Sequence, residues 1–437
     1  MNRIITMTAV AWLTLTVSAQ TAQEEIQANK YLSGSNYVDY DRQLSTIPLT
    51  PSPEGYEPYY MSHYGRHGSR WLIDSANYSH AIEPLRKAHA WGKLTAKGEE
   101  ALAALERFVP TTTLRLGDLT TVGERQHHGI ARRMVSHFPE IFLKPGVAID
   151  ARSTVVVRCI LSMTAECEEF AAANPTARIH NDVSQAFQYY LNGKRDGIVK
   201  ALGRKGRKVR KGYNSRVDTC RVIQSLFSDT EWARDSVRAW DFIYNLFEVT
   251  SNMQSHDTDI DLFPLFTHSE IYEQWRLRNI GWYIDYAAAP VTQGLMPFAQ
   301  RHLLRNIIET ADTITQTQAT MRFGHESVLM PLSALMELGN CGAEVENLDT
   351  LDHVWRNYRI FPMASNIQLI FYRRTDGQEG DILVKALLNE REVTLPVPTS
   401  RHPYYPWSSL RQYYLDKLSR FEELSRVTME GHPTDHP

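Results

Sequence analysis

The sequence predicts an α/β fold: an open, mostly parallel sheet flanked by helices, with an inserted and mainly α-helical cap domain. Two short apolar runs, at 147–151 and 319–323, each precede a polar turn and a segment with helical spacing, which is the alternation that builds parallel sheets. An aromatic-rich run at 59–64 leads into another polar turn, the first of the three along the chain. A chain of 437 residues with 43% hydrophobic content can bury a large core, which we expect to be divided between two lobes.

The turn after the aromatic-rich run carries the densest chemistry in the chain. It reads Arg66, His67, Gly68, Ser69 and Arg70. Guanidinium groups bind phosphoryl oxygens two at a time, and a neutral imidazole nitrogen can attack phosphorus. The turn therefore indicates a phosphate site, and a charged surface loop is the alternative interpretation because five-residue patterns also recur by chance.

The second polar turn begins at Arg152, where an expected strand ends. Ser153 or Thr154 is the expected N-cap of the next helix, and this places Arg158 in the first turns of that helix. Arg158 is therefore a second source of positive charge at a strand–helix junction.

The third polar turn runs from Gly324 through His325 and Glu326, and helical spacing then continues to Gly339. In an open α/β sheet, ligands bind beyond the carboxyl ends of the strands, and the first free N–H groups of the following helices favour an anion there. The three turns are therefore predicted to converge on one phosphate.

The chain between the second and third junctions changes character. Residues 177–315 read as mostly helical, and we expect them to form the cap. Residues 21–176 and 316–437 are expected to form the two parts of the sheet domain. The second part should contain strands near 367–372 and 382–388, a proline-rich loop at 396–406 and a last helix near 410–424.

The cap opens with a strongly basic run. Nine lysines and arginines but only one acid, Asp196, lie between residues 194 and 211, in a chain whose formal net charge is −3. We interpret the run as an electrostatic funnel for a highly phosphorylated small molecule, with Lys205 and Arg207 as candidate substrate-binding residues. A solvated helix is the alternative. A nucleic-acid surface is disfavoured because the run lacks interleaved aromatic residues apart from Tyr213.

Residues 1–20 have the pattern of a signal peptide. Arg3 precedes an apolar stretch from Ile4 to Val17, which ends in small residues typical of a cleavage site. The stretch is too short to span a bilayer comfortably. We expect export to a periplasm or outside the cell, with no membrane attachment once the segment is removed.

The four cysteines do not suggest a zinc site. Cys159 and Cys167 lie on one expected helix, about 12 Å apart along its axis, so they cannot pair with each other. Cys220 and Cys341 are the more conceivable pair, and buried free thiols are the alternative.

These motifs resemble the histidine phosphatase superfamily, specifically its histidine acid phosphatase and phytase branch, and most closely the multiple inositol polyphosphate phosphatases. The resemblance extends from Tyr56 to about Trp407. It includes the approach to the first polar turn, the Arg152 turn, and the stretches 252–257 and 281–286.

The resemblance implies that His67 becomes phosphorylated during hydrolysis of a phosphomonoester. It implies that the transferring phosphoryl group is bound by Arg66, Arg70, Arg158 and His325. Glu326 would protonate the departing alcohol oxygen. The substrates implied are phosphorylated small molecules, the inositol phosphates and above all inositol hexakisphosphate.

The segment after the third strand departs from both patterns of the resemblance. The phytase branch usually reads His-Asp and the inositol polyphosphate phosphatase branch usually reads His-Ala-Glu, whereas this chain reads His325, Glu326, Ser327. Either Glu326 reaches the leaving group in its own way or the proton donor lies elsewhere. Two rival functions therefore stay open: a broad-specificity acid phosphatase, and a phosphate-ester binder that has lost acid catalysis.

The implied chemistry needs no metal or cofactor, because three arginines and a histidine can neutralise the transferring group. Attack requires an unprotonated nitrogen on His67, whereas His325 stabilises charge better when protonated. A glutamic acid donates a proton only when neutral, and its unperturbed pKa is about 4.3. An acidic pH optimum is therefore expected, unless burial beside phosphate raises that pKa.

The remaining histidines and aromatic residues are expected to be structural. No spacing joins the histidines into a metal site. The histidines assigned to structural or surface roles are His63, His127, His128 and His180, and the aromatic residues assigned to the core are Tyr189, Tyr190, Trp282 and Tyr283. The oligomeric state is left open.

Overall fold

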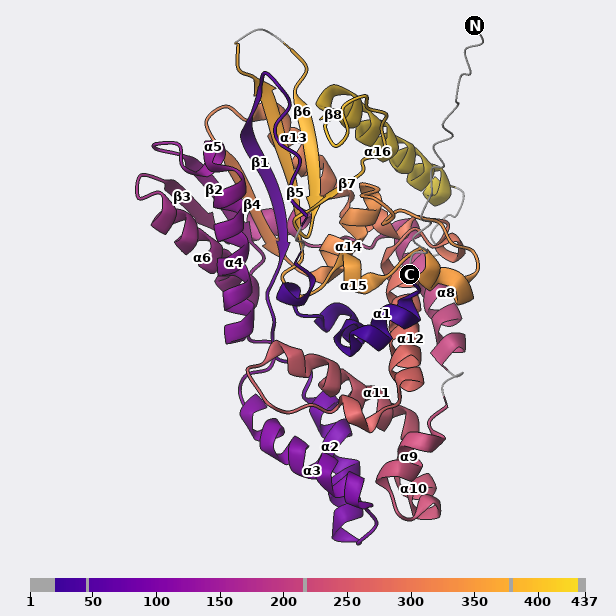
Figure 1. The fold of residues 1–437 in the computed structure, drawn as a ribbon. Coiled ribbons are helices and arrows are strands. Elements are labelled where there is room, and N and C mark those ends of the chain that lie inside the picture. Colours follow the sequence, from indigo (N-terminus) through magenta and orange to yellow (C-terminus); the bar gives the residue numbers. More distant parts are fainter. Residues whose placement is uncertain (1–19, 45–46, 215–217, 377–379, 431–437) are drawn as a thin grey trace, which may run out of the picture.

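The computed structural model describes residues 20–44, 47–214, 218–376 and 380–430. It has two lobes, a sheet flanked by helices and a helical lobe (Figure 1). The predicted signal peptide and its cleavage site lie almost wholly outside the described residues. No helix in the described ranges is both long enough and apolar enough to cross a bilayer.

The sheet confirms the predicted α/β class. Its strands lie in the order β3-β2-β4-β1-β5-β6-β7, with β8 pairing with β6. Strands β1 to β4 run parallel, whereas β5 joins β1 antiparallel and continues the sheet through β6. The strands are β1 (Tyr56–Arg66), β2 (Ala148–Ser153), β3 (Arg178–Asp182), β4 (Ala319–Gly324), β5 (Asn366–Arg374), β6 (Leu383–Leu388), β7 (Arg391–Val393) and β8 (Tyr405–Pro406).

Helices flank both faces of this sheet and build the second lobe. The helices of the first half of the chain are α1 (Ala22–Ala28), α2 (Ser75–Ala90), α3 (Ala96–Phe108), α4 (Thr121–His137), α5 (Pro139–Phe142), α6 (Val157–Ala173), α7 (Gln188–Leu191) and α8 (Gly197–Asn214). Those of the second half are α9 (Cys220–Leu226), α10 (Thr230–Ser236), α11 (Ala239–Asn252), α12 (His268–Tyr286), α13 (Arg301–Thr313), α14 (Glu326–Leu335), α15 (Asn357–Ile360) and α16 (Trp407–Glu430).

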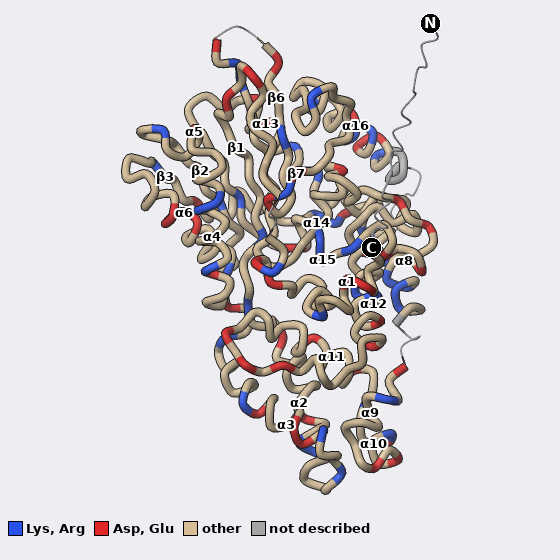
Figure 2. The backbone as a smooth tube through the Cα atoms, in the orientation of Figure 1, with Lys and Arg blue, Asp and Glu red and all other residues tan. Residues whose placement is uncertain are grey.

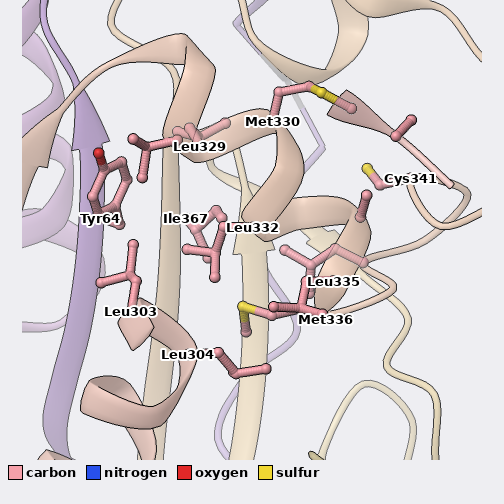
Figure 3. Close-up of a cluster of buried hydrophobic side chains, with 14 of the residues drawn as sticks. Tyr64, Leu303, Leu304, Leu329, Met330, Leu332, Leu335, Met336, Cys341 and Ile367 are labelled. Atoms are coloured by element: carbon pink, nitrogen blue, oxygen red, sulfur yellow. The ribbon is translucent and has the colours of Figure 1, made fainter. Parts of the chain in front are cut away.

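Alternating side chains of β1 pack into two separate cores. Met61 points into the core shared with α4 and α6, whereas Tyr64 packs on the other face with Leu303 of α13, Leu329 of α14 and Ile367 of β5 (Figure 3). This period of two is expected for a strand that is covered on both faces. It fixes the central strand, and with it the polar turn at the end of the strand.

The predicted domain boundaries differ from the observed arrangement. β3 lies inside the range 177–315 but pairs with β2 in the sheet. In turn, α2 and α3 precede that range but share the apolar core of the helical lobe with α9 and α11 (Figure 1). The helical lobe is therefore assembled from two separate stretches of chain rather than from one insertion.

Two local predictions also need correction. Helix α6 has Val156 as its N-cap, with no side-chain cap bond, instead of Ser153 or Thr154. All four cysteines are free thiols, and Cys220 is exposed while Cys341 is buried, so the conceivable pair does not form. The chain is therefore held together by packing and polar contacts rather than by a disulfide.

Candidate active site

Arg66 ends β1 with a fully buried guanidinium group. Its Nη1 donates to three backbone carbonyls, those of Asn36 at 2.6 Å, Phe361 at 3.0 Å and Pro362 at 2.9 Å. Its Nη2 is buried without a hydrogen-bond partner among the described residues. Burial lowers the pKa of Arg66 to about 10, so the group stays positive at neutral pH and one edge remains available to an anion.

His67 follows directly and is fully buried. Its Nδ1 lies 2.9 Å from the carbonyl oxygen of Gly68, which assigns the ring proton to Nδ1 and leaves Nε2 unprotonated. Burial lowers the pKa of His67 well below 6.5, although Glu326 opposes this shift. The imidazole is therefore neutral, with its free nitrogen facing the site.

Arg70 and Arg158 approach the same space from two further elements. The Arg70 guanidinium lies 5.5 Å from the centre of the Tyr37 ring, and the Arg70 carbonyl accepts a hydrogen bond of 3.0 Å from Asn252. Arg158 stands in the first turn of α6, and its Nη1 donates to the Gly117 carbonyl at 3.4 Å. Burial lowers the pKa of Arg158, and the positive charge of Arg70 lowers it further.

His325 is the N-cap residue of α14, and its side chain makes no capping bond. Its ring centre lies 5.7 Å from that of His67, and its Nε2 lies 3.4 Å from the Thr154 hydroxyl. Burial lowers the pKa of His325 to about 4. His325 is therefore neutral in the free site. A bound anion would favour the protonated form, which stabilises the charge of a phosphoryl group better.

Glu326 occupies the centre of this group. Its Oε2 lies 3.2 Å from Arg66 Nε and 3.4 Å from His67 Nε2, and its Oε1 lies 3.9 Å from Arg70 Nη2. Burial acts to raise the pKa of Glu326, but Arg66, His67 and Arg70 together lower it well below 4.5. The carboxylate therefore stands as an anion in the space between the nucleophile candidate and the arginines.

Three of these residues also form a possible set of metal ligands. One ligand atom each from His67, His325 and Glu326 lies within 4.8 Å of the others. Three ligands at such a spacing resemble a metal cluster, but the buried guanidinium groups of Arg66 and Arg70 face the same space. Their charge disfavours a divalent cation, so this donor set fits an anion better.

A cavity of about 470 Å³ adjoins this site in the helical lobe and is called the aromatic pocket below. Its polar wall contains Arg210 of α8, which is paired with Asp285 of α12. Arg195 stacks on the Tyr286 ring at 4.2 Å and donates to the Asp285 carbonyl at 2.7 Å. The pocket is lined by Arg210, Trp240, Tyr244, Leu277, Arg278, Gly281, Trp282, Asp285 and Tyr286.

Helix α8 carries most of the basic run (Figure 2), and its cations differ in exposure: Lys205 and Lys208 are exposed, whereas Arg210 is partly buried. Gly206 faces α12 so closely that an added Cβ would lie 2.8 Å from Ile284. Burial raises the pKa of Asp285, and Arg210, Arg195 and Arg207 oppose this shift, although Arg207 itself is exposed and does not line the pocket. Lys205 lies on the exposed face of the helix, and the structure does not bring it into the pocket.

Sequence reasoning missed several residues of this region. Trp282 was assigned to the core but lines the pocket, and Tyr189 is 62% exposed. Arg210 lies in the basic run and Asp285 lies in the stretch 281–286. Their spacing in the sequence does not show that they pair. Tyr37 carried no signal, because nothing in its surrounding sequence suggests a ligand site.

The expected structural histidines are buried or paired away from the phosphate site. His127 lies 2.7 Å from Glu166, with both side chains fully buried. His63 is buried without a hydrogen-bond partner among the described residues, and His128 pairs with Glu169 at 2.8 Å. His180 lies 3.2 Å from Asp150. This agrees with the structural role predicted for them.

No family model matches the sequence, and no curated protein sequence matches it either. Solved structures do match. The multiple inositol polyphosphate phosphatase of Bifidobacterium longum in complex with inositol hexasulfate has a TM-score of 0.71 and 18% identity, over 88% of this chain and 97% of that one. The phytase of D. castellii has a TM-score of 0.68 and 13% identity, over 94% of this chain and 90% of that one.

A third match is the Hafnia alvei phytase, with a TM-score of 0.53 and 11% identity over 84% of this chain and 98% of that one. Identities this low establish the fold and not the activity. The chain therefore has the fold of the phytases and inositol polyphosphate phosphatases that its sequence motifs resemble.

Proposed function

We propose that this protein is an exported phosphomonoesterase that hydrolyses inositol polyphosphates through a phosphohistidine intermediate on His67. The observation that carries the proposal is that the Glu326 carboxylate lies among Arg66, Arg70 and His67 Nε2, so that an anion is already held beside a buried nitrogen that stays unprotonated. In-line phosphoryl transfer requires a neutral nucleophile and cations that hold the phosphoryl oxygens, and both lie here at the carboxyl ends of parallel strands.

In the proposed first step, the phosphoryl group takes the place that the Glu326 carboxylate holds between the arginines. His67 Nε2 forms a bond to phosphorus as the bond from phosphorus to the alcohol oxygen breaks. The Arg66, Arg70 and Arg158 side chains neutralise the equatorial oxygens, and His325 adds a further donor. Glu326, displaced toward the leaving group, gives its proton to the departing alkoxide.

In the second step, water attacks the phosphorus of the phosphohistidine. Glu326 takes a proton from that water, the bond between phosphorus and Nε2 breaks, and inorganic phosphate leaves. The donor of the first step is thus restored in its acid form, and His67 returns to its neutral form. Each turnover consumes one water and releases one alcohol and one phosphate.

The choice of inositol polyphosphates is supported by the ligands of the structural relatives. The B. longum phosphatase is complexed with inositol hexasulfate, and the Hafnia alvei phytase is complexed with myo-inositol hexakis sulphate. In this chain, cations of α8 and Arg195 surround Asp285 at the mouth of the adjoining pocket. They offer positive charge to the phosphates that do not react.

A comparison of two substrates tests the proposal. Initial rates are measured on inositol hexakisphosphate and on para-nitrophenyl phosphate, with wild type and with His67→Ala. We expect wild type to hydrolyse both, and His67→Ala to hydrolyse neither while keeping its fold by circular dichroism. Turnover by folded His67→Ala would rule out the covalent mechanism, and an inactive wild type that still binds phosphate would favour the phosphate-ester binder.

A broad-specificity phosphatase is the second candidate. It is favoured by the lining of the adjoining pocket, which is aromatic along two helices. Activity on the aryl phosphate alone would support this candidate, since an aryl oxide leaves without a proton donor whereas an inositol alkoxide does not.

A further inference from the structure

The aromatic pocket is walled by two pairs of neighbouring rings, one stacked and one tilted. Trp240 and Tyr244 of α11 have ring centres 4.9 Å apart and planes inclined by 15°. Trp282 and Tyr286 of α12 have centres 4.9 Å apart and planes inclined by 31°. In each pair the residues are four apart on a helix, so one helical face presents a continuous strip of ring surface. Trp240 is 37% exposed, which leaves its ring accessible.

Both walls of the pocket lead back to the phosphoryl site. The Trp282 ring lies 4.8 Å from the Phe361 ring, and the Phe361 carbonyl is a hydrogen-bond acceptor for Arg66. On the same side, Tyr286 is near enough to Glu326 for the carboxylate to raise its pKa, after the larger effect of burial. The ring strip of α12 is therefore linked through Phe361 to Arg66, and we expect a leaving group held at the phosphoryl site to reach it.

The opposite wall makes the same connection. Glu248 raises the pKa of Tyr244, and after the larger effect of burial it also raises the pKa of Tyr37, whose ring faces Arg70. Arg278 lies 4.5 Å from the Tyr244 ring centre and pairs with Glu248 at 2.8 Å. This wall of the pocket is thus linked to Arg70 through Glu248 and Tyr37.

The charges inside the pocket are mostly neutralised. Arg278 is paired with Glu248, and Arg210 is paired with Asp285. The faces of aromatic rings carry partial negative charge, so they do not favour phosphate oxygens, whereas they stack well with a flat, uncharged ring. The two ring strips are therefore matched to a planar group, while the cations around Asp285 at the mouth of the pocket stay available to phosphates.

We propose that the aromatic pocket binds a planar heteroaromatic ring carried by the leaving alcohol, so that the protein also hydrolyses nucleoside monophosphates. The proposal rests on the phosphatase function proposed above and adds a second class of substrate to it. The ring stacks on Trp282 or Trp240, and Asp285 offers an acceptor to a ring amino group. His67 takes the phosphoryl group, the nucleoside leaves with a proton from Glu326, and water then releases phosphate.

Adenosine 5′-monophosphate and ribose 5-phosphate test this inference, because they share the reacting primary phosphate and differ by the base. We expect kcat/KM for the nucleotide to exceed that for the sugar phosphate by at least about fivefold, the factor that about 1 kcal/mol of base stacking gives. Trp240→Leu and Trp282→Leu should each bring this ratio toward one. Trp91→Leu, which alters a tryptophan 68% exposed and outside the pocket, is the matched control and should keep the ratio.

A binding measurement separates this inference from the proposed function. Adenosine should quench the tryptophan fluorescence of wild type and of the Trp91→Leu variant, and should quench the Trp240→Leu variant less, whereas ribose should not quench. Selective quenching by adenosine in a protein that cleaves no phosphomonoester would support the ring pocket and reject the phosphatase. Equal kcat/KM for the two phosphates, or a ratio unchanged in both pocket variants, would overturn the inference.

Discussion

At the residue scale, the position of Glu326 sets the conditions for catalysis. In the free protein its carboxylate is held as an anion by Arg66, His67 and Arg70. A bound phosphoryl group would take over these cations and place negative charge beside the carboxyl. Both effects raise its pKa, which is what a proton donor needs. The same side chain would then act as a competing anion before binding and as an acid afterwards.

Replacement of this residue tests both roles. Glu326→Gln should lower kcat on inositol phosphates by roughly 10²–10⁴-fold, the usual range for general acid catalysis, and lower kcat on an aryl phosphate far less. Inorganic phosphate should also inhibit the variant at lower concentrations than it inhibits wild type, because the competing carboxylate is gone. Equal losses on the two substrates would instead assign Glu326 a structural or phosphate-binding role.

The state of His67 predicts the acid side of the pH profile. Its pKa is lowered well below 6.5 in the free site, and kcat/KM reports the ionisation of the free enzyme. After correction for ionisation of the substrate, kcat/KM for para-nitrophenyl phosphate should therefore show no fall centred near pH 6.5. A fall centred near pH 6.5 would show that His67 titrates as an exposed histidine does.

At this scale the sequence identified much of the candidate site. The residues of the three strand–helix turns lie together, because parallel strands deliver their carboxyl ends to one edge. Tyr37 and Glu248 could not be found in this way. They come from a 3₁₀ segment and from the interior of α11, and their role depends on packing between distant parts of the chain.

At the scale of elements, helix α8 has two faces with different roles, which a count of its charges does not distinguish. One face packs against α12, where Gly206 permits close approach and Arg210 pairs with Asp285. The other face exposes Arg204, Lys205 and Lys208 to solvent. Periodicity predicts a helix here, but which cations turn inward depends on the neighbouring helix, which the sequence pattern does not reveal.

The exposed cations are expected to act through long-range attraction. Replacing Arg204, Lys205, Arg207 and Lys208 together with glutamine should lower kcat/KM for inositol hexakisphosphate at low salt and flatten its dependence on ionic strength. The value for a monophosphate should barely change, and kcat should hold on both substrates. If the variant matches wild type on the hexakisphosphate at low salt, the exposed face of α8 has no substrate role.

At the scale of the whole molecule, buried histidines make the protein sensitive to acid. Burial lowers the pKa of His63 and His67 well below 6.5, and lowers the pKa of His256 and His325 to about 4. In the unfolded chain these groups bind protons near pH 6.5. The free energy of unfolding therefore has its full value above that pH. It declines as the pH falls below it, by up to about 1.4 kcal/mol per pH unit for each histidine.

Denaturation by urea at pH 7.5, 6 and 5 measures this decline. His63→Met should reduce the loss of unfolding free energy between pH 7.5 and 5, because it removes one buried titrating ring that lies away from the phosphate site. Inorganic phosphate should raise the free energy of unfolding of wild type more at pH 5 than at pH 7.5, because a bound anion favours the protonated form of His325. A pH-independent free energy of unfolding would contradict the account.

The overall architecture was predictable only in part. The α/β class followed from strand–helix alternation around the three turns. The two-part helical lobe did not, because α2 and α3 join it through apolar faces that look the same in sequence as faces packed on a sheet. The five residues of β3 likewise show too little alternation of apolar and polar side chains to distinguish an edge strand from a loop.

The central claim is that His67 carries the phosphoryl group, and trapping that intermediate tests it most directly. Wild type is mixed with ³²P-labelled inositol hexakisphosphate, denatured within milliseconds at alkaline pH, and counted for protein-bound label. We predict label that approaches one phosphate per chain, is lost in acid as a phosphohistidine is, and is absent from folded His67→Ala. Rapid turnover by wild type with no bound label, or label that persists in His67→Ala, would contradict the claim.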